Sequence, residues 1–414
     1  MCVRFLSPVR LLIPPAGWTL QNFSSIKEQQ VGGWTQAGCH GTGAALPPVD
    51  ETVVSLRLVT PAKGTLFLDA ATNPRLFALA KVGLGCLGVV AEVTLQGVRA
   101  HALAEHTQLM SHSAVLRGHA ARLGAHRHVR YMWLPYTEAC VVVTADPLES
   151  CPPGTATTVL PHEAERTASL RSLVARAHPQ LAADRGASFA DLRAAALAAN
   201  PLSAAHVADV NAAEAAFWAA SAGWRVGTSE DILGFECGGE QEVAEAAVPC
   251  GTRRRPSGAD VAFAADTLAL IRSRGIPAPA PLEQRWSCGS SAPMSPAFAA
   301  PAPGDALFSW LGIIMYLPPP GPSRAAVQAS FAAYKRDWLA LGDKYGASQH
   351  WAKIEAPRSE AELMALRATL RARFPVADFN AARAELDPHN VLGNEAVDAL
   401  LPRFRGGAHA VPQP

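Results

Sequence analysis

A carboxylate and a guanidinium lie two positions apart at Glu283 and Arg285, just after the proline-rich sequence PAPAP of residues 277–281. If the chain continues as an extended strand through Trp286, alternation places the two charged side chains on one face. Such a pair can hold a polyhydroxylated ring. It also fits an exposed ion pair on a strand, which usually contributes little to stability. From the residues alone we prefer the ion pair.

A second polar group is the sequence HWAK at residues 350–353. On a strand, His350 and Ala352 would face one way, and Trp351 and Lys353 the other. Lys353 could stabilise an oxyanion or donate a hydrogen bond to a hydroxyl, although a surface lysine is the simpler interpretation. We assign no catalytic role to His350.

Two glycine-rich stretches, VGGWTQAGCHGTGA at 31–44 and GLGCLGVVAEVTLQ at 83–96, suit close approach of the main chain to a flat, pyrophosphate-bearing cofactor. The second fits the letters G-x-G-x-x-G, but that fingerprint should follow a strand and open a helix. Here it follows an expected helix at 74–81 and opens an expected strand at 89–95, so a glycine turn is an equally good interpretation. The candidate cofactor contacts are Ser24, Ser25, Gly32, Gly33, Gly38, His40, Gly41, Thr42, Gly43, Gly85, Gly88, Val89 and Val90.

Hydrophobic periodicity predicts the elements that must position these groups, and together they indicate an α+β protein. An alanine-rich helical region is expected at 162–223, broken at Asn200–Pro201. The apolar run at 310–317 is too short to span a membrane and is expected to be a buried strand. Further expected elements are a strand at 53–59, paired strands within 131–144, a helix at 260–274, and a core-facing stripe of Leu363, Leu366, Leu370 and Phe374.

Composition excludes several classes of function. With 414 residues, 49% of them hydrophobic, and a net charge of +1, the chain can bury large cores and gives no argument for binding nucleic acid. The basic run of residues 253–255 is expected to be a solvated loop. Eight cysteines without CxxC spacing indicate neither a disulfide framework nor a metal site. Among them Cys237 could line a cleft, although a buried thiol is the preferred interpretation.

The order of many blocks resembles the plant-type L-galactono-1,4-lactone dehydrogenases. These belong to the vanillyl-alcohol-oxidase type of FAD proteins, together with the aldonolactone and alditol oxidases. The blocks are LQNFSSIKEQQVGGWTQAGCHGTGAALPPVDE (20–51), LVTPAKGT (58–65), GLGCLGVVAEVTLQ (83–96), HVRYMWLPYTEACVVVT (128–144), GFECGGEQ (234–241), IPAPAPLEQRW (276–286), LFSWLGIIMYLP (307–318), HWAKIE (350–355) and LDPHNVLGN (386–394).

The resemblance implies a domain organisation. Residues 1–98 would form the C-terminal part of an FAD-binding domain, 99–375 a cap domain with an antiparallel sheet and flanking helices, and 376–414 a segment returning to the FAD domain. The family places a targeting region and a first flavin-binding subdomain before Leu20, and we expect this chain to lack them. Residues 1–15 carry Arg4 and Arg10 and no acidic residue, which resembles an organelle-targeting sequence.

The resemblance also implies site roles and reverses the preference for a mere ion pair. Glu283, Arg285 and Lys353 would contact substrate at the flavin, and Ser25 would touch the substrate. Ser24 stands where the plant enzymes usually have alanine, so its hydroxyl could alter dioxygen access. Ser25 and Glu28 also fit a helix capping box, and both roles can hold at once. Histidines bonded covalently to flavin in this superfamily generally lie further upstream. The resemblance therefore implies that His40 belongs to the loop that packs along the cofactor and that FAD is bound non-covalently.

The implied activity is oxidation of L-galactono-1,4-lactone to L-ascorbate, with Arg285 and Lys353 offsetting negative charge and Glu283 binding hydroxyls. The family further implies cytochrome c as electron acceptor and the mitochondrial inner membrane or intermembrane space as location, with any membrane association peripheral. Two alternatives stay open. One is a non-catalytic remnant acting as a binding or assembly protein, and the other is an aldonolactone oxidase that uses dioxygen.

Overall fold

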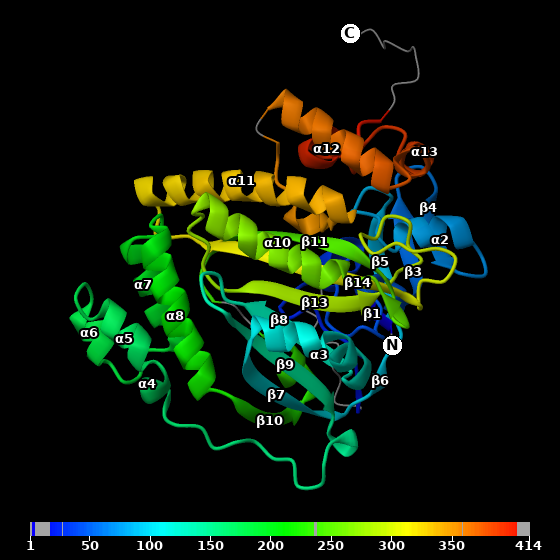
Figure 1. The fold of residues 1–414 in the computed structure, drawn as a ribbon. Coiled ribbons are helices and arrows are strands. Elements are labelled where there is room, and N and C mark those ends of the chain that lie inside the picture. The colour runs from blue at the N-terminus through cyan, green and yellow to red at the C-terminus, as the bar shows by residue number, and fades with distance from the viewer. Residues whose placement is uncertain (1, 5–16, 27, 236–237, 358, 404–414) are drawn as a thin grey trace.

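The computed structural model describes residues 2–4, 17–26, 28–235, 238–357 and 359–403 (Figure 1). Its centre is a nine-stranded antiparallel sheet in the order β10-β7-β9-β8-β13-β14-β11-β12, with β15 paired to β11. The strands are β7 (Ala102–Ser111), β8 (His128–Trp133), β9 (Ala139–Pro147), β10 (Gly223–Thr228), β11 (Gln241–Thr252), β12 (Arg255–Pro256), β13 (Leu282–Cys288), β14 (Ala306–Tyr316) and β15 (Ser348–Gln349). The paired strands predicted within 131–144 and the buried strand at 310–317 are confirmed.

Three helices cover one face of this large sheet (Figure 1): α3 (His112–Ala125), α10 (Ala259–Arg274) and α11 (Pro322–Gly342). Their apolar side chains share one core with alternate residues of the strands, including Trp286, Phe263 and Trp338. The helix predicted at 260–274 is confirmed, and it ends where Gly275 adopts a left-handed φ of 60°. Because alternation places Trp286 on the helix-covered face, Glu283 and Arg285 take their places on the other face.

The alanine-rich region forms a separate helical group: α4 (Glu163–Arg166), α5 (Ala168–Val174), α6 (Pro179–Ala183), α7 (Phe189–Ala199) and α8 (Ala204–Ala220). The predicted break at Asn200–Pro201 is confirmed, since α7 ends just before it. Val207, Val210 and Phe217 are buried along one side of α8. This group lies at one end of the large sheet, as Figure 1 shows in green.

A second, smaller antiparallel sheet has the strand order β1-β5-β3-β4. Its strands are β1 (Cys2–Arg4), β3 (Val53–Thr60), β4 (Gly64–Asp69) and β5 (Val89–Leu95), joined by α2 (Pro74–Ala80), while α1 (Val31–Gln36) precedes them and β2 (Trp18–Thr19) pairs with β6 (Val98–Arg99). The predicted strands at 53–59 and 89–95 and the predicted helix at 74–81 are confirmed. Their buried side chains form one cluster with the C-terminal helices α12 (Glu360–Arg373), α13 (Val376–Leu386) and α14 (Glu395–Leu400).

That cluster includes Leu370 and Phe374 of the predicted α12 stripe, so this core-facing prediction is confirmed at its two buried members. The chain thus returns to the small sheet before residue 376. The α+β class predicted from the sequence is confirmed by two antiparallel sheets with helices packed on their faces. Short elements complete the fold: α9 (Ser229–Leu233) and the 3-10 turns η2 (Val49–Thr52), η3 (Leu148–Ser150), η4 (Asp343–Tyr345) and η5 (Trp351–Lys353).

Several sequence features expected to carry no chemistry can now be placed. Within the described part of the chain, no helix has the length and apolar character needed to cross a bilayer. Buried free thiols occur at Cys39, Cys86, Cys140, Cys250 and Cys288, as expected. Cys237 and most of the basic N-terminal sequence at 1–15 lie outside the described residues.

Candidate active site on the large sheet

Glu283 and Arg285 lie on one face of β13, as strand alternation predicts. Arg285 Nε lies 3.4 Å from Glu283 Oε2, and Arg130 Nη1 of the neighbouring β8 lies 3.8 Å from Glu283 Oε1. The Arg285 side chain is only 8% exposed and that of Glu283 19%. An exposed surface ion pair, preferred from the residues alone, is therefore wrong, because the guanidinium is buried in the protein. A buried pair must be matched by further partners.

The further partner is Glu245 of β11, which the sequence analysis missed. Its Oε1 accepts a hydrogen bond from Arg285 Nη2 at 2.7 Å, and its side chain is 8% exposed. Glu245 and Glu283 lie close together because both pair with Gly312 of the intervening strand β14. Glycine has no side chain, so nothing from β14 stands between the two carboxylates. A charged residue inside the apolar run VAEAAV was the signal that could have identified Glu245.

His40 from the first glycine-rich stretch joins the same carboxylate. Its Nε2 lies 3.1 Å from Glu245 Oε1, its Nδ1 lies 3.0 Å from the carbonyl oxygen of Gly41, and its ring stacks on Trp310 with centroids 3.7 Å apart. Burial, followed by the charge of Arg285, lowers the pKa of His40. The ring is therefore neutral near pH 7, and the charged carboxylate is its stronger acceptor. We assign the proton to Nε2, which donates to Glu245.

These neighbours stabilise the ionised form of Glu245. Burial opposes its ionisation, but Arg285 and then His40 outweigh burial and hold the pKa of Glu245 well below its usual value. The carboxylate is thus ionised at neutral pH and is shared between a cation and a neutral donor. This arrangement fixes the guanidinium of Arg285 in one orientation on the sheet face opposite to α3, α10 and α11.

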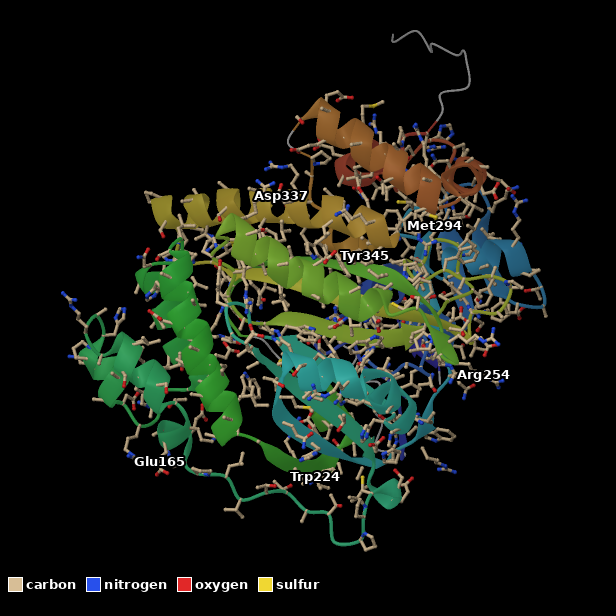
Figure 2. The ribbon with its side chains drawn as sticks, in the orientation of Figure 1. Glu165, Trp224, Arg254, Met294, Asp337 and Tyr345 are labelled. Atoms are coloured by element: carbon tan, nitrogen blue, oxygen red, sulfur yellow. The ribbon has the colours of Figure 1, made fainter. Side chains whose placement is uncertain are left out.

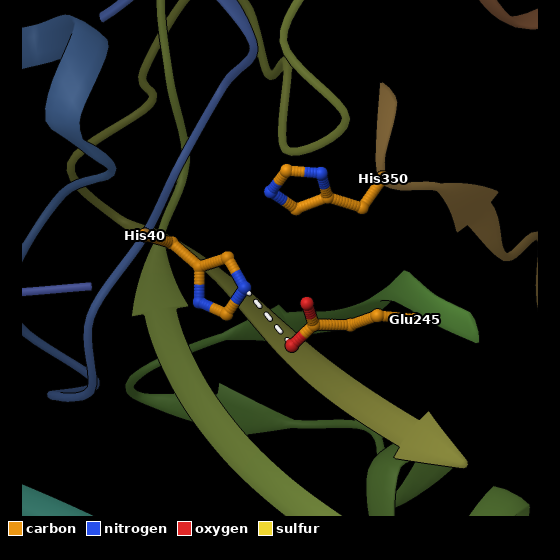
Figure 3. Close-up of side chains that lie close together, drawn as sticks. All are labelled: His40, Glu245 and His350. Carbon is orange, nitrogen blue, oxygen red and sulfur yellow. Dashed lines mark hydrogen bonds and ion pairs between the residues drawn. The ribbon is translucent and has the colours of Figure 1, made fainter. Parts of the chain in front are cut away.

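His350 lies beside His40 and Glu245 (Figure 3) and is bonded to Glu245 through its backbone. Its backbone N–H donates to the carbonyl of Glu245 at 2.9 Å, and its Nδ1 accepts from the N–H of Ala352 at 3.1 Å. Burial lowers the pKa of His350 to about 3. Ligand atoms of His40, Glu245 and His350 all lie within 4.8 Å of one another, a spacing that a metal ion could use. Arg285 already occupies Glu245 Oε1, so we interpret the group as a hydrogen-bonded network instead.

Lys353 lies beside this network, but its local structure differs from the prediction. Residues 351–353 form the 3-10 turn η5 rather than a strand, because the His350 side chain caps the turn. The strand-based alternation of HWAK is therefore wrong. Lys353 is partly exposed, and its charge contributes, after burial and Glu245, to the environment that sets the pKa of His350. The structure thus brings Lys353 near the Glu245 group.

Ser24 and Ser25 form a tight corner instead of a helix start. The capping box predicted for Ser25 is wrong: the Ser25 hydroxyl donates to the carbonyl of Ser24 at 2.6 Å, and α1 begins only at Val31. Ser25 has a left-handed φ of 64°, which is rare for serine and is a form of strain often found at functional sites. The Ser24 hydroxyl accepts from Trp34 Nε1 at 2.7 Å and donates to Gln29.

This corner is connected to Glu283 through one aromatic residue. The N–H of Phe235 donates to the carbonyl of Ser25 at 3.1 Å. The guanidinium of Arg130 lies 3.7 Å above the Phe235 ring, and Arg130 also faces Glu283. Ser25 therefore belongs to the same region as the charged pair.

The glycines of the first stretch approach the protein's own atoms. A Cβ on Gly41 would lie 2.2 Å from Asn22 Oδ1, and that oxygen accepts from the N–H of Thr42 at 3.2 Å. The N–H of Gly43 donates to the carbonyl of Trp286 at 2.7 Å. Gly38 has a left-handed φ of 69°. The loop is thus fixed directly against β13, next to Arg285.

The second stretch is packed in the same manner. A Cβ on Gly88 would lie 2.5 Å from Leu58, whereas Gly85 has open space. The N–H of Leu84 donates to the carbonyl of Gln36 in α1 at 3.2 Å, so the two stretches meet. Val90 is buried and Val89 is 47% exposed. Gly33, next to buried Gly32, borders a cavity of about 230 Å³ that Trp351 and Ala352 also line.

Comparison with known proteins gives the family of the chain. Residues 93–400 match the D-arabinono-1,4-lactone oxidase (ALO) family. The chain is 46% identical over 402 residues to the mitochondrial L-galactono-1,4-lactone dehydrogenase of Arabidopsis thaliana, covering 93% of this chain and 66% of that protein. It is also 46% identical over 395 residues to L-galactono-1,4-lactone dehydrogenase 2, mitochondrial, of Oryza sativa subsp. japonica, covering 93% of this chain and 67% of that protein.

The chain therefore spans about two thirds of the length of these plant relatives. Its fold is similar to that of a cholesterol oxidase from Brevibacterium sterolicum, with a TM-score of 0.71 and 14% identity, covering 97% of this chain and 81% of that one. The family match covers most of the chain and includes β13, β11 and η5, which carry the charged network. The chain belongs to the D-arabinono-1,4-lactone oxidase family of aldonolactone oxidoreductases.

Proposed function

We propose that this chain carries the substrate-binding face of an FAD-dependent dehydrogenase that oxidises L-galactono-1,4-lactone to L-ascorbate. One observation carries the proposal: the buried guanidinium of Arg285 lies between Glu283 and Glu245, beside the His40 loop. The plant relatives named for this activity support the choice of substrate.

The residues present fit a flavin. The corner at Ser24 and Ser25 is strained and polar, and the loop of residues 38–43 ends against the strand that carries Arg285. We propose that these two segments, with Gly32 and Gly33 and with Gly85 to Val90, hold FAD non-covalently. FAD, when bound, accepts a hydride from the substrate carbon.

The charged side chains have separable roles in this proposal. Glu283 accepts hydrogen bonds from hydroxyl groups of the lactone ring and orients it. Arg285 and Lys353 offset negative charge that develops on the substrate oxygen. Arg130 and Arg285 face two carboxylates, Glu245 and Glu283, and the charge of Lys353 acts on the neighbouring His350, so the group includes three cationic and two anionic side chains. Burial of Arg285 strengthens its interactions, because little water competes there.

We further propose cytochrome c as the electron acceptor and the mitochondrion as the location. The plant relatives carry the word mitochondrial in their names, which supports the location. The inner membrane or intermembrane space and a peripheral membrane association follow only from the family resemblance.

The test is flavin reduction in the purified 414-residue chain supplemented with FAD. We expect the absorbance band of bound FAD to bleach without oxygen when L-galactono-1,4-lactone is added, and cytochrome c to restore it. Glu283→Gln should bind FAD equally well and bleach much more slowly. A chain that takes up no FAD would contradict the proposal and would favour a non-catalytic binding or assembly protein.

A second candidate function is an aldonolactone oxidase. Ser24 bears on this choice, since a hydroxyl held by Trp34 and Gln29 at this corner would alter dioxygen access. Hydrogen peroxide formed in air at a rate equal to flavin turnover, without cytochrome c, would select the oxidase. Ser24→Ala, which removes this hydroxyl, should change the rate of peroxide formation. A Ser24→Ala chain that forms peroxide at the unchanged rate would refute a role for this hydroxyl.

A further inference from the structure

A cavity of about 620 Å³ lies at one end of the large sheet, away from the Glu245 group. The end of α3, the β11–β12 hairpin, and Leu307 of β14 line it. Leu307 pairs with Cys288, which shares the helix-covered face with Trp286. The cavity therefore opens on the face opposite to Arg285. Its volume lies within the range of small-molecule sites, ~300–1,000 Å³.

Positive side chains surround this cavity. Arg127, Arg253 and Arg254 line it together with His126. Two of them belong to the basic run that the sequence suggested was a solvated loop. Arg254 extends from the hairpin at the margin of the sheet (Figure 2). Arg253 is shared with Asp305, whose Oδ1 lies 4.0 Å away.

The acidic residue in the lining, Asp146, is already engaged. Its Oδ2 lies 2.6 Å from His126 Nδ1, and its Oδ1 accepts from the backbone N–H of Arg127 at 2.7 Å. Its carboxylate thus anchors the loop, and the one negative charge in the lining stands against three arginines. Arg127 Nε, by contrast, is buried without a hydrogen-bond partner among the described residues. No acceptor among the described residues therefore fixes the Arg127 side chain through its Nε.

The remaining lining is small and apolar. Ala44, Ala45, Ala120 and Leu123 contribute side chains without hydrogen-bonding groups. Such a surface suits a flat ring, while guanidinium groups suit phosphate oxygens because their donors match them in pairs. We infer that this cavity is a binding site for a phosphorylated small molecule of nucleotide size, separate from the lactone site.

The experiment titrates ADP into the purified full chain by calorimetry, with inorganic pyrophosphate as competitor. We expect saturable binding of one ADP, weakened about tenfold or more in Arg254→Gln and in Arg127→Gln, since each removes a charge-assisted hydrogen bond. The matched control is Arg255→Gln, which removes the same charge from the same hairpin outside the cavity lining. It should bind ADP within about twofold of the original chain.

Three results would overturn the inference. ADP that fails to bind at millimolar concentration would exclude a nucleotide-sized site. Equal weakening by Arg255→Gln and Arg254→Gln would show attraction to a basic surface only. Displacement of ADP by an equal amount of FAD would assign the cavity to the flavin. Arg254 is exposed, so its variant is informative even if Arg127→Gln fails to fold. None of these measurements depends on the lactone oxidation proposed above.

Discussion

Replacing Glu245 by glutamine should destabilise the protein strongly, because it removes the negative charge of this side chain and leaves its shape nearly unchanged. Arg285 loses the counter-ion that lies 2.7 Å from its Nη2. The new side chain has one acceptor oxygen in place of two, and its amide N–H groups would meet the N–H of His40 if the amide were turned the other way. Breaking a buried ion pair by removing one partner costs about 3–5 kcal/mol of unfolding free energy. Because glutamine can still accept from Arg285, we expect about 3 kcal/mol.

The loss should depend on pH with a defined sign. The folded-state pKa of Glu245 is well below its usual value of 4.5, so its contribution is fully present above pH 4.5 and is lost as the pH falls toward the folded pKa. The difference between the original chain and Glu245→Gln should therefore be largest near pH 7 and should shrink in acid. Urea unfolding followed by tryptophan fluorescence at pH 7 and at lower pH measures it.

Glu242→Gln is the matched control. Glu242 lies on the same strand, and its Oε1 accepts from the neutral Gln328 amide at 2.8 Å, without an ion pair to Arg285. We expect a change below about 1 kcal/mol at either pH. If Glu245→Gln is as stable as Glu242→Gln at neutral pH, or if its loss persists undiminished in acid, the ionic role of Glu245 is refuted.

Three further predictions use other parts of the structure. Asp50 is buried, and burial raises its pKa to about 6 against an opposing hydrogen bond from Ser290. The free energy of unfolding should therefore fall by up to about 3 kcal/mol as the pH rises from about 4 to 7. Asp50→Asn should abolish this decline when urea unfolding is measured at several pH values. Gly41→Ala should cost about 2–3 kcal/mol, since its Cβ would lie 2.2 Å from Asn22 Oδ1, whereas Gly33→Ala, with open space in α1, should be neutral or stabilising by thermal unfolding. Arg285→Lys should lower kcat/KM for L-galactono-1,4-lactone about a hundredfold in a cytochrome c reduction assay, because an ammonium cannot span Glu283 and Glu245 together; an unchanged kcat/KM would remove Arg285 from the proposed mechanism.

Local patterns were sufficient for much of the fold. Alternation predicted that Glu283 and Arg285 share a face, and the Asn200–Pro201 pair marked the end of α7. Each of these depends on residues within a few positions of one another. The glycine-rich stretch at 31–44 was predicted to approach a cofactor, which stays a prediction: residues 31–36 form α1, and the close neighbours of Gly41 and Gly43 are Asn22 and Trp286.

Long-range partners and irregular turns could not be predicted in this way. Glu245 meets Arg285 only because β14 inserts between β11 and β13, a strand order that no local pattern encodes. The η5 turn at Lys353 depends on a cap from the His350 side chain, and the corner at Ser25 depends on a left-handed φ. Serine rarely adopts that φ, so the capping-box interpretation was the better local choice and tertiary structure overruled it.

The register across three strands explains why a glycine interrupts the apolar sequence WLGIIMY of β14. Gly312 pairs with Glu245 on one side and with Glu283 on the other, so all three positions share the sheet face opposite to the helices. A large side chain at 312 would enter the space between the two carboxylates. Arg285 spans that space, with Nη2 on Glu245 and Nε facing Glu283. The orientation of the guanidinium therefore follows from the pairing of the strands, and the charged group is positioned by the sheet itself and not by a mobile loop.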